Sequence, residues 1–378
     1  FVEIDNVDGY DSGPGYSALQ CKSYLQRPFY ITTCDCLIDS NMPHLDGNWL
    51  GIYPTSYPEK YSTLKLGEKD NVIDYMNKNI NILSNSFNNK KVIITGANGL
   101  VGLPAVKKCL EEGAAKVYAV DLRFGENLNF LKGKYEDRLV LVKTDLTYLS
   151  HCESLFTDEK IDIVLHIAGV KGSPARSSTQ PADYLFPMLM FNTNMIKASF
   201  DAKVDWFVYL SSVGVYKPAD IMNEGDTWNQ EETWASTPSR LDWHPGWTKR
   251  MGELTLDSLR VQYGWKNYTV IRPSNIYGIN DNFAQDATVI SSNIWKLFNV
   301  EGEEMVCWGD GSSRRDFVFG DDVAQASIDV VKKEVRDIIN FGCAEAVSIK
   351  DTIETIVECY TEITGKTKNI VWDSTKTN

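Results

Sequence analysis

The chain has 378 residues, of which 43% are hydrophobic and 24% are charged, and its formal net charge at pH 7 is -13. This length and composition are those of a globular protein with a sizeable core and room for about two domains. The negative charge disfavours nucleic acid and anionic membrane surfaces as partners, because their phosphates would be repelled.

Residues 1–85 contain short motifs in a fixed order. These are Gly13–Gln20 followed by a helix, the apolar strand Pro28–Asp35, and Asn48–Gly51 followed by Lys60–Lys65. The order resembles part of a sugar-phosphate nucleotidyltransferase, in which an aspartate at such a strand end holds Mg²⁺ through its oxygens. Asp35 is therefore a candidate metal ligand, and an ordinary turn residue is the alternative. The glycine-rich triphosphate loop is missing from this segment, so we expect no nucleotidyl transfer.

A stretch rich in Asn, Ser and Lys, Asn77–Lys91, is predicted to be a linker or a helix end and loop. Strands and helices alternate after it. The predicted strands are Val92–Thr95, Lys116–Val120, Leu139–Lys143, Ile163–Ile167, Trp206–Leu210, Tyr268–Arg272 and Ile370–Asp373. The predicted helices are Leu103–Gly113, Pro187–Ala202, Trp247–Tyr263 and Ile353–Thr364. Such alternation predicts an α/β fold with a doubly wound parallel sheet and helices on both faces.

Three glycines, Gly96, Gly99 and Gly102, follow the first of these strands and precede a helix. They would let the backbone turn sharply and approach a pyrophosphate at the helix N-terminus. Asp121 ends the next strand, where its carboxylate can accept hydrogen bonds from an adenosine ribose. A carboxylate there repels a 2′-phosphate, which favours NAD over NADP, although Arg123 could pair with that phosphate. A glycine turn without a ligand is the alternative.

From about residue 90 to 378 the chain resembles the extended short-chain dehydrogenase/reductases, the NAD-dependent nucleotide-sugar epimerases and dehydratases. The resemblance rests on the ordered motifs Thr95–Gly102, Asp121, Thr144–Leu146, His166–Gly169, Asn192–Asn194, Leu210–Tyr216, Lys249–Glu253, Arg272–Gly278, Trp308–Gly311 and Arg315–Phe317. It implies a Rossmann-type domain with a small substrate lobe mainly after residue 275. It also implies bound NAD, a nucleotide-sugar substrate, and a homodimer formed through the helices at 187–202 and 247–263, whose apolar faces could alternatively pack on the protein's own sheet.

The resemblance assigns a cofactor site residue by residue. Its members are Gly96, Asn98, Gly99, Leu100, Val101, Gly102, Asp121, Leu122, Arg123, Asp145, Leu146, Ile167, Ala168, Gly169, Asn192, Leu210, Ser211, Lys249, Pro273, Asn275 and Ile276. Among them Asp145 matches an adenine contact and Lys249 matches the lysine that binds the nicotinamide ribose. Asp145 could instead be a strand-end turn residue, and Asn192 could cap or kink its helix.

The resemblance also assigns substrate contacts. Ser212 matches the catalytic hydroxyl that bonds the sugar hydroxyl being oxidised, while Asn275 and Arg315 match residues that hold the nucleotide diphosphate, for which an arginine fork is suited. Ser211 and Ser212 could instead satisfy nearby backbone groups, and Arg315 could form a surface ion pair.

The sequence departs from the family at the proton carrier. The family places a tyrosine four residues before the lysine, and here that position is Pro245. His244 is its neighbour and a competent general base near neutral pH, so it is our candidate substitute, with a surface or capping histidine as the alternative. Tyr216 is a weaker substitute.

Two subclasses are disfavoured by the residues that follow Ser212. The 4,6-dehydratases carry an acidic pair at the positions of Val213 and Gly214. The epimerase/reductases similar to GDP-fucose synthase carry a cysteine at the position of Gly214. The sequence therefore predicts a simpler epimerase or oxidoreductase.

The eight cysteines are scattered, and Cys34 and Cys36 have neither redox nor zinc spacing. No apolar run approaches the roughly 18 residues of a spanning helix, and no secretory leader precedes the motifs. We therefore expect reduced thiols and a cytoplasmic location, without a membrane partner.

These patterns together predict an NAD-dependent enzyme that removes hydride from a nucleotide-sugar carbon and returns it. A catalytically idle binding module remains an alternative, and Pro245 is its support. Half of a bifunctional nucleotidyltransferase–epimerase is a second alternative.

Overall fold

The computed structural model describes residues 30–31, 49–50, 63–66, 72–76, 87–172, 174–217, 230–239, 242–343 and 345–375. The chain divides into two units, Phe1–Ser86 and Phe87–Asn378. In the first unit β1 (Tyr30–Ile31) pairs in parallel with β2 (Trp49–Leu50), and β3 (Thr63–Leu66) pairs antiparallel with β4 (Val72–Met76). Asp35 lies outside the described residues, so its assignment as a metal ligand stays a prediction.

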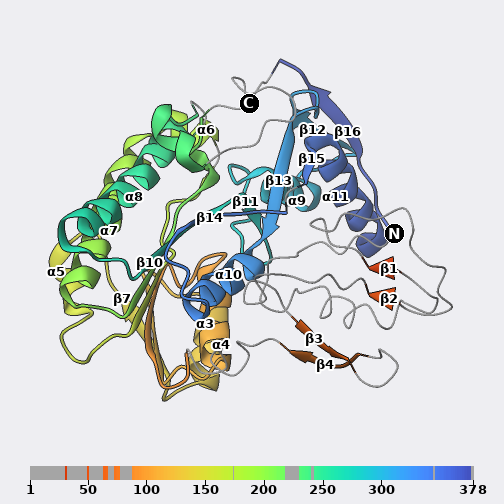
Figure 1. Ribbon diagram of the computed structural model, residues 1–378. Helices are drawn as coiled ribbons and strands as arrows, with labels where there is room; N and C mark the ends of the chain where they lie inside the picture. Colours follow the sequence, from red (N-terminus) through yellow and green to blue (C-terminus); the bar gives the residue numbers. More distant parts are fainter. Residues whose placement is uncertain are drawn as a thin grey trace. The chain divides into compact units, whose positions relative to one another are not determined.

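A seven-stranded parallel sheet forms the centre of the second unit (Figure 1). Its strands are β5 (Lys91–Thr95), β6 (Lys116–Asp121), β7 (Leu139–Lys143), β8 (Ile163–His166), β9 (Trp206–Leu210), β10 (Tyr268–Pro273) and β14 (Ile338–Phe341). Their order is β14-β10-β9-β8-β5-β6-β7, which confirms the predicted doubly wound sheet. The order reverses between β5 and β8, and ligands of such sheets bind at the carboxyl ends of the strands beside this reversal.

Alternate residues of each strand face two separate cores, because both faces of a parallel sheet are covered by helices. On β5, Val92 and Ile94 pack into one core and Ile93 into the other. The first core holds α3 (Gly102–Glu111), α4 (Glu126–Lys134) and α10 (Gly320–Lys332). The second holds α5 (Leu149–Ser154), α7 (Ala182–Asp201) and α8 (Trp243–Tyr263).

The two longest helices of this unit differ from their predicted starts. α7 begins at Ala182, so Pro187 lies inside the helix instead of opening it. Its tertiary contacts outweigh the one hydrogen bond that the proline cannot make, since Met188 and Phe191 are buried in the second core. α8 begins at Trp243 with Pro245 in its first turn, where the missing N–H costs little.

A smaller lobe is built from the chain after β10. It contains β11 (Asn275–Tyr277), α9 (Val289–Asn299), β12 (Glu304–Trp308), β13 (Arg314–Phe319), β15 (Ala346–Ser348), α11 (Ile349–Thr364) and β16 (Asn369–Asp373). Its own core includes Leu297, Met305 and Val357. Between its strands the chain returns to the main sheet to form α10 and β14. The predicted strand at Ile370–Asp373 and helix at Ile353–Thr364 are present, whereas β11, β12, β13 and β15 were not foreseen.

Candidate active site

The glycine-rich turn closes tightly at the carboxyl end of β5. Gly96 has a φ of 66°, which side chains disfavour, and a Cβ there would lie 2.8 Å from the Cα of Ala168. A Cβ on Gly102 would lie 2.0 Å from the carbonyl oxygen of Gly96. Both positions therefore require glycine. The turn brings the first turn of α3, with its N–H groups and positive dipole end, to the edge of the pocket.

The carboxylate of Asp121 is fixed beside this turn by backbone N–H groups. One of its oxygens accepts a hydrogen bond from the N–H of Asn98 at 2.9 Å, and the other accepts one from Leu122 at 2.7 Å. Asn98 accepts a further bond from the N–H of Gly125 at 2.7 Å. The oxygen bonded to Leu122 also lies 3.5 Å from the backbone nitrogen of Arg123, whereas the oxygen bonded to Asn98 retains a second lone pair with which Asp121 can accept from a ribose hydroxyl. Arg123 is exposed nearby.

A buried polar chain crosses the sheet below the pocket. The Thr95 hydroxyl oxygen accepts the N–H groups of Ile167 and Ala168, each at 3.2 Å, so its proton is donated to Nδ1 of His166 at 2.8 Å. His166 then donates from Nε2 to the Asn192 side-chain oxygen at 3.0 Å. Desolvation, together with the positive charge of Lys249, lowers the pKa of His166 to about 3, so this imidazole stays neutral. Asn192 therefore bonds to His166 and is not among the described residues that line the pocket.

Asp145 forms a local turn at the end of β7. Its Oδ1 accepts hydrogen bonds from the N–H of Thr147 at 2.9 Å and from the Thr147 hydroxyl at 2.7 Å. These bonds are those of a strand-end turn, and they fix the carboxylate in the wall of the pocket. Leu146 beside it is buried, and its carbonyl oxygen accepts a bond from Asn194 at 3.1 Å.

A buried ion pair supports the catalytic end from below. Arg272 and Glu253 are almost fully buried and meet through two hydrogen bonds of 3.0 and 2.6 Å. Ser211 donates its hydroxyl proton to Glu253 at 2.6 Å. Arg272 donates to the Tyr216 hydroxyl at 2.9 Å, and that hydroxyl donates to Asn340. Ser211 and Tyr216 are thus engaged in a structural network, and Tyr216 is not poised as the proton carrier.

The amine of Lys249 lies between the carboxyl ends of β8 and β9. It donates to the carbonyl oxygen of Leu210 at 2.7 Å and lies 4.0 Å from the position of a Cβ on Gly169. Desolvation lowers the pKa of Lys249 to about 8, and the negative charge of Glu253 opposes this. The lysine therefore borders the part of the pocket that the nicotinamide half of a dinucleotide would occupy.

Ser212 caps η4 (Val213–Val215), accepting a hydrogen bond from the N–H of Gly214 at 3.1 Å. A Cβ on Gly214 would lie 3.4 Å from the Ser212 hydroxyl oxygen and 3.4 Å from the carboxyl carbon of Asp242. Desolvation raises the pKa of the Asp242 carboxyl, while the positive charge of Arg315 opposes the rise. This aspartate was not foreseen from the sequence.

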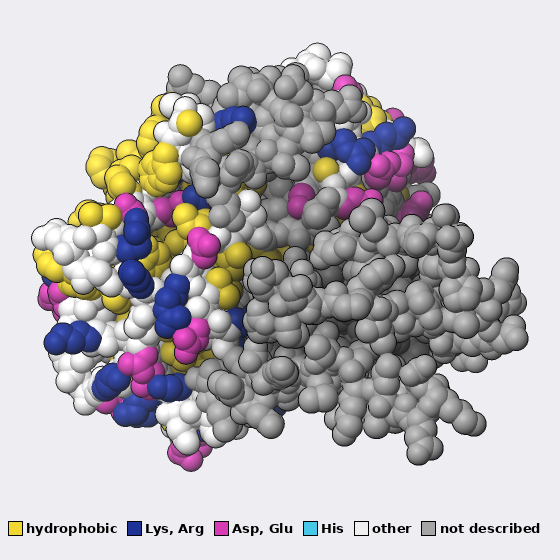
Figure 2. All heavy atoms as spheres, viewed as in Figure 1, with side chains coloured by type: hydrophobic (Ala, Val, Ile, Leu, Met, Phe, Trp, Pro, Cys, Tyr) yellow, Lys and Arg dark blue, Asp and Glu magenta, His cyan; other side chains and the backbone are white. Residues whose placement is uncertain are grey.

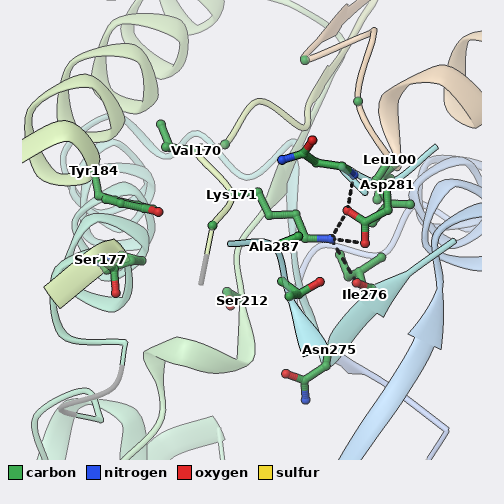
Figure 3. Close-up of a pocket in the computed structure, with 18 of the residues that line it drawn as sticks. Leu100, Val170, Lys171, Ser177, Tyr184, Ser212, Asn275, Ile276, Asp281 and Ala287 are labelled. Carbon is green, nitrogen blue, oxygen red and sulfur yellow. Dashed lines mark hydrogen bonds and ion pairs between the residues drawn. The ribbon is translucent and has the colours of Figure 1, made fainter. Parts of the chain in front are cut away.

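An ion pair between Lys171 and Asp281 joins two segments that line the pocket. Lys171 lies 2.7 Å from one oxygen of Asp281 and 2.8 Å from the other, and it also donates to the carbonyl oxygen of Ile276 at 3.3 Å. Figure 3 shows this pair between the segment after β8 and the segment after β11. The Asp281 side chain is 2% exposed, and Ser291 donates a further bond to it at 2.5 Å. Both residues were missed in the sequence.

Asn275 and Arg315 come from neighbouring strands of the lobe. Asn275 donates from its side chain to the carbonyl oxygen of Asp316 at 2.9 Å, and β11 pairs in parallel with β13. Arg315 is half-buried and donates to the carbonyl oxygen of Arg314 at 2.8 Å. The Arg315 guanidinium is close enough to Asp242 to affect the pKa of its carboxyl.

One continuous pocket of about 1690 Å³ connects these groups. Of the predicted site residues, those that line it are Gly96, Asn98, Gly99, Leu100, Val101, Gly102, Asp121, Leu122, Arg123, Asp145, Leu146, Ile167, Ala168, Gly169, Leu210, Ser211, Ser212, Lys249, Pro273, Asn275, Ile276 and Arg315. Asn192 and His244 are not among the described residues that line it, whereas Asp242 and Pro245 are. Pockets for one small molecule measure roughly 300–1,000 Å³, so this one has room for two ligands.

The described residues contain no group of three His, Cys, Asp or Glu side chains arranged to hold a metal ion. In the same part of the chain no helix is long and apolar enough to cross a membrane.

The fold and this pocket define a Rossmann-type dinucleotide-binding protein. Residues 92–342 match the NAD dependent epimerase/dehydratase family, and the chain belongs to that family of enzymes. The resemblance stated from the sequence motifs is thereby confirmed.

The chain is similar to nucleotide-sugar enzymes over most of its length. It is 28% identical to GDP-L-fucose synthase 1 of Arabidopsis thaliana, over 78% of this chain and 84% of the relative. The solved UDP-glucose 4-epimerase of Thermotoga maritima with UDP-glucose aligns at a TM-score of 0.60 and 25% identity, over 75% of this chain and 85% of that one. The Thermus thermophilus UDP-glucose 4-epimerase with NAD aligns at a TM-score of 0.63 and 22% identity, over 76% and 88%.

Proposed function

We propose that this enzyme transfers hydride reversibly at a carbon of a nucleotide-sugar, acting as an NAD-dependent epimerase or reductase. The observation that supports this most is the single pocket in which the glycine-rich turn and Asp121 lie at one end and Ser212, Lys249 and Arg315 line the other. A dinucleotide that lies along the carboxyl ends of the strands would bring its nicotinamide toward Lys249. When bound, it would accept or donate the hydride.

NAD is the dinucleotide that Asp121 favours. Its carboxylate is fixed by two backbone N–H groups, so it cannot swing away from a ribose phosphate without breaking both bonds. The exposed Arg123 is the residue that would admit a 2′-phosphate if Asp121 were removed.

The remaining roles follow from where the side chains lie. Ser212 would hold the sugar hydroxyl, and the neutral His166 fixes Thr95 below the nicotinamide end without adding charge. Arg315 and Asn275 would hold the diphosphate, since a guanidinium is suited to bidentate phosphate contacts. Several relatives are named GDP-L-fucose synthase, among them those of Arabidopsis thaliana and Escherichia coli, yet Gly214 stands where such epimerase/reductases carry cysteine. We therefore favour one hydride-transfer centre without a separate cysteine acid.

A homodimer and a cytoplasmic location complete the proposal. Helices α7 and α8 expose large apolar side chains, including Phe186 at 66%, Met190, Leu254 and Val261 at 70%. Figure 2 shows apolar side chains gathered over this side of the molecule. A second copy of the chain would bury them. The described cysteines, both buried and exposed, are free thiols, as a reducing compartment requires.

The first test is to denature purified protein, identify any released dinucleotide by mass, and incubate native protein with UDP-, GDP-, CDP- and dTDP-sugars. We expect bound NAD and conversion of one of these sugars. If NAD is retained and no sugar in the panel is converted, the idle binding module, which Pro245 favours, replaces this proposal.

A further inference from the structure

The active site lacks the tyrosine that its family uses, so a different group must move the proton. In the helix that carries Lys249, the tyrosine position is Pro245, which has no proton to exchange. His244 is not among the described residues that line the pocket, although it is the nearest titratable neighbour in sequence. Asp242 does line the pocket, and it occupies the N-cap of α8, seven residues before Lys249.

We infer that Asp242 is the catalytic proton carrier of this enzyme, acting on the same sugar hydroxyl that Ser212 holds. The inference rests on the proposed hydride transfer and names the residue that completes it. Its first support is position. A Cβ added to Gly214 would lie 3.4 Å from the Asp242 carboxyl carbon and also 3.4 Å from the Ser212 hydroxyl oxygen, so both groups border the same small space. A sugar hydroxyl bound to Ser212 would therefore be within reach of the carboxylate.

The second support is that the Asp242 side chain does not cap α8. It occupies the N-cap position of α8, where an aspartate ordinarily accepts a hydrogen bond from an N–H of the first turn. Its side chain makes no such capping bond within the described part of α8. The helix start is held by backbone bonds instead, because the Asp242 carbonyl oxygen accepts from Gly246 and its N–H donates to Ser239. Asp242 keeps exposed surface as a residue and lines the pocket, while its carboxyl is partly desolvated there.

The third support is a pair of glycines, Gly214 and Gly246, in the contact between η4 and the start of α8. A Cβ on Gly214 would lie 3.2 Å from the Cβ of Asp242, tighter than ordinary contact. A Cβ on Gly246 would lie 2.4 Å from the Gly214 carbonyl oxygen, so glycine at this position lets α8 approach η4. These two glycines therefore bring the aspartate to Ser212, and the raised pKa of its carboxyl suits a group that must both take and release a proton.

In the oxidising direction the carboxylate of Asp242 takes the hydroxyl proton, the C–H bond breaks with its electron pair passing as hydride to the oxidised nicotinamide dinucleotide, and a C=O bond forms. In the reducing direction the hydride returns to the carbonyl carbon, and protonated Asp242 gives its proton to the oxygen.

The test compares full-length wild type, Asp242→Asn and the control Asp257→Asn, which makes the same charge change on the exposed face of α8. On the nucleotide-sugar that the wild type converts, Asp242→Asn should lose at least about a hundredfold in turnover, and the control should not. In calorimetry Asp242→Ala should bind that nucleotide-sugar about tenfold more weakly, because a bond to a charged group is lost. It should bind the matching nucleoside diphosphate as the wild type does.

The pH profile gives a further readout. The oxidising rate of the wild type should fall as pH drops through the raised pKa of Asp242, and this fall should be absent in Asp242→Asn. The charged and titratable groups that could distort the profile are Arg315 from β13 and His244 and Lys249 on α8. Retained turnover in Asp242→Asn with loss in His244→Ala would overturn the inference. Failure of the proposed function would instead be visible in the wild type, as no conversion of any sugar.

Discussion

The two ends of the pocket are built in different ways. At the proposed dinucleotide end, the glycine-rich turn, the start of α3 and Asp121 all come from one short stretch of chain that runs from the end of β5 to the end of β6. At the catalytic end, Ser212, Asp242, Lys249 and Arg315 come from η4, the start and the second turn of α8, and β13. A local site depends on its own backbone conformation, whereas an assembled site depends on the packing that brings its elements together.

The largest expected effect is at the support of the assembled end. Replacing Glu253 by Gln leaves Arg272 buried without its counter-charge, and this should cost about 3–5 kcal/mol of unfolding free energy. The matched control, Asp257→Asn, removes the exposed partner of Arg260 and should cost less than about 1 kcal/mol. Urea unfolding of both variants measures the difference. Equal small losses would show that the Arg272 pair does not hold the catalytic end.

A smaller effect is expected at the local end. Gly96→Ala forces a side chain into a left-handed conformation, which costs roughly 1–2 kcal/mol, and places it against Ala168. Dinucleotide binding should weaken at least about tenfold, as followed by fluorescence titration. Gly133→Ala is the control, since a Cβ there meets no atom within 4 Å. Equal binding by both variants would contradict the assignment of the turn.

The choice of dinucleotide should change by a similar or smaller factor. Asp121→Ser removes the carboxylate that opposes a 2′-phosphate and leaves Arg123 beside the ribose. The ratio of NADP to NAD affinity should rise about tenfold, which corresponds to about 1.4 kcal/mol. Asp137→Ser, an exposed change elsewhere in the chain, should leave the ratio unaltered. An unchanged ratio in Asp121→Ser would show that a residue other than Asp121 contacts the ribose.

The most gradual effect is a pH dependence of stability. The pKa of Lys249 is about 8 in the folded enzyme and 10.5 ordinarily, so the unfolded chain binds more protons between these values. The contribution of Lys249 to stability therefore improves as pH rises through this window, by about 1–3 kcal/mol. Lys249→Met should remove that rise from the pH series of unfolding midpoints. A series identical to wild type would mean that the amine is not desolvated.

The local end could be read from the sequence, since its turn glycines, strand and acid are close in the chain. The same holds for the parallel sheet, whose strands are short apolar runs. The catalytic end could not be read in this way. The role that we propose for Asp242 depends on the contact between η4 and α8 that Gly214 and Gly246 allow. The bond between Lys171 and Asp281 joins residues 110 positions apart. The strands between residues 300 and 348 were missed because they are not continuous apolar runs: β13 begins with Arg314, Arg315 and Asp316, and alternate residues of β12 are exposed.

The path of the chain through the lobe also bears on how such enzymes diversify. The chain leaves the sheet after β10, builds β11 to β13, returns through α10 to add the edge strand β14, and departs again for β15, α11 and β16. The lobe is thus made of two separate segments of the chain, β11 to β13 and β15 to β16. The lobe therefore cannot be replaced by exchanging one continuous stretch of sequence. Exchange of the whole lobe would need compatible connections at three points, after β10, before α10 and after β14.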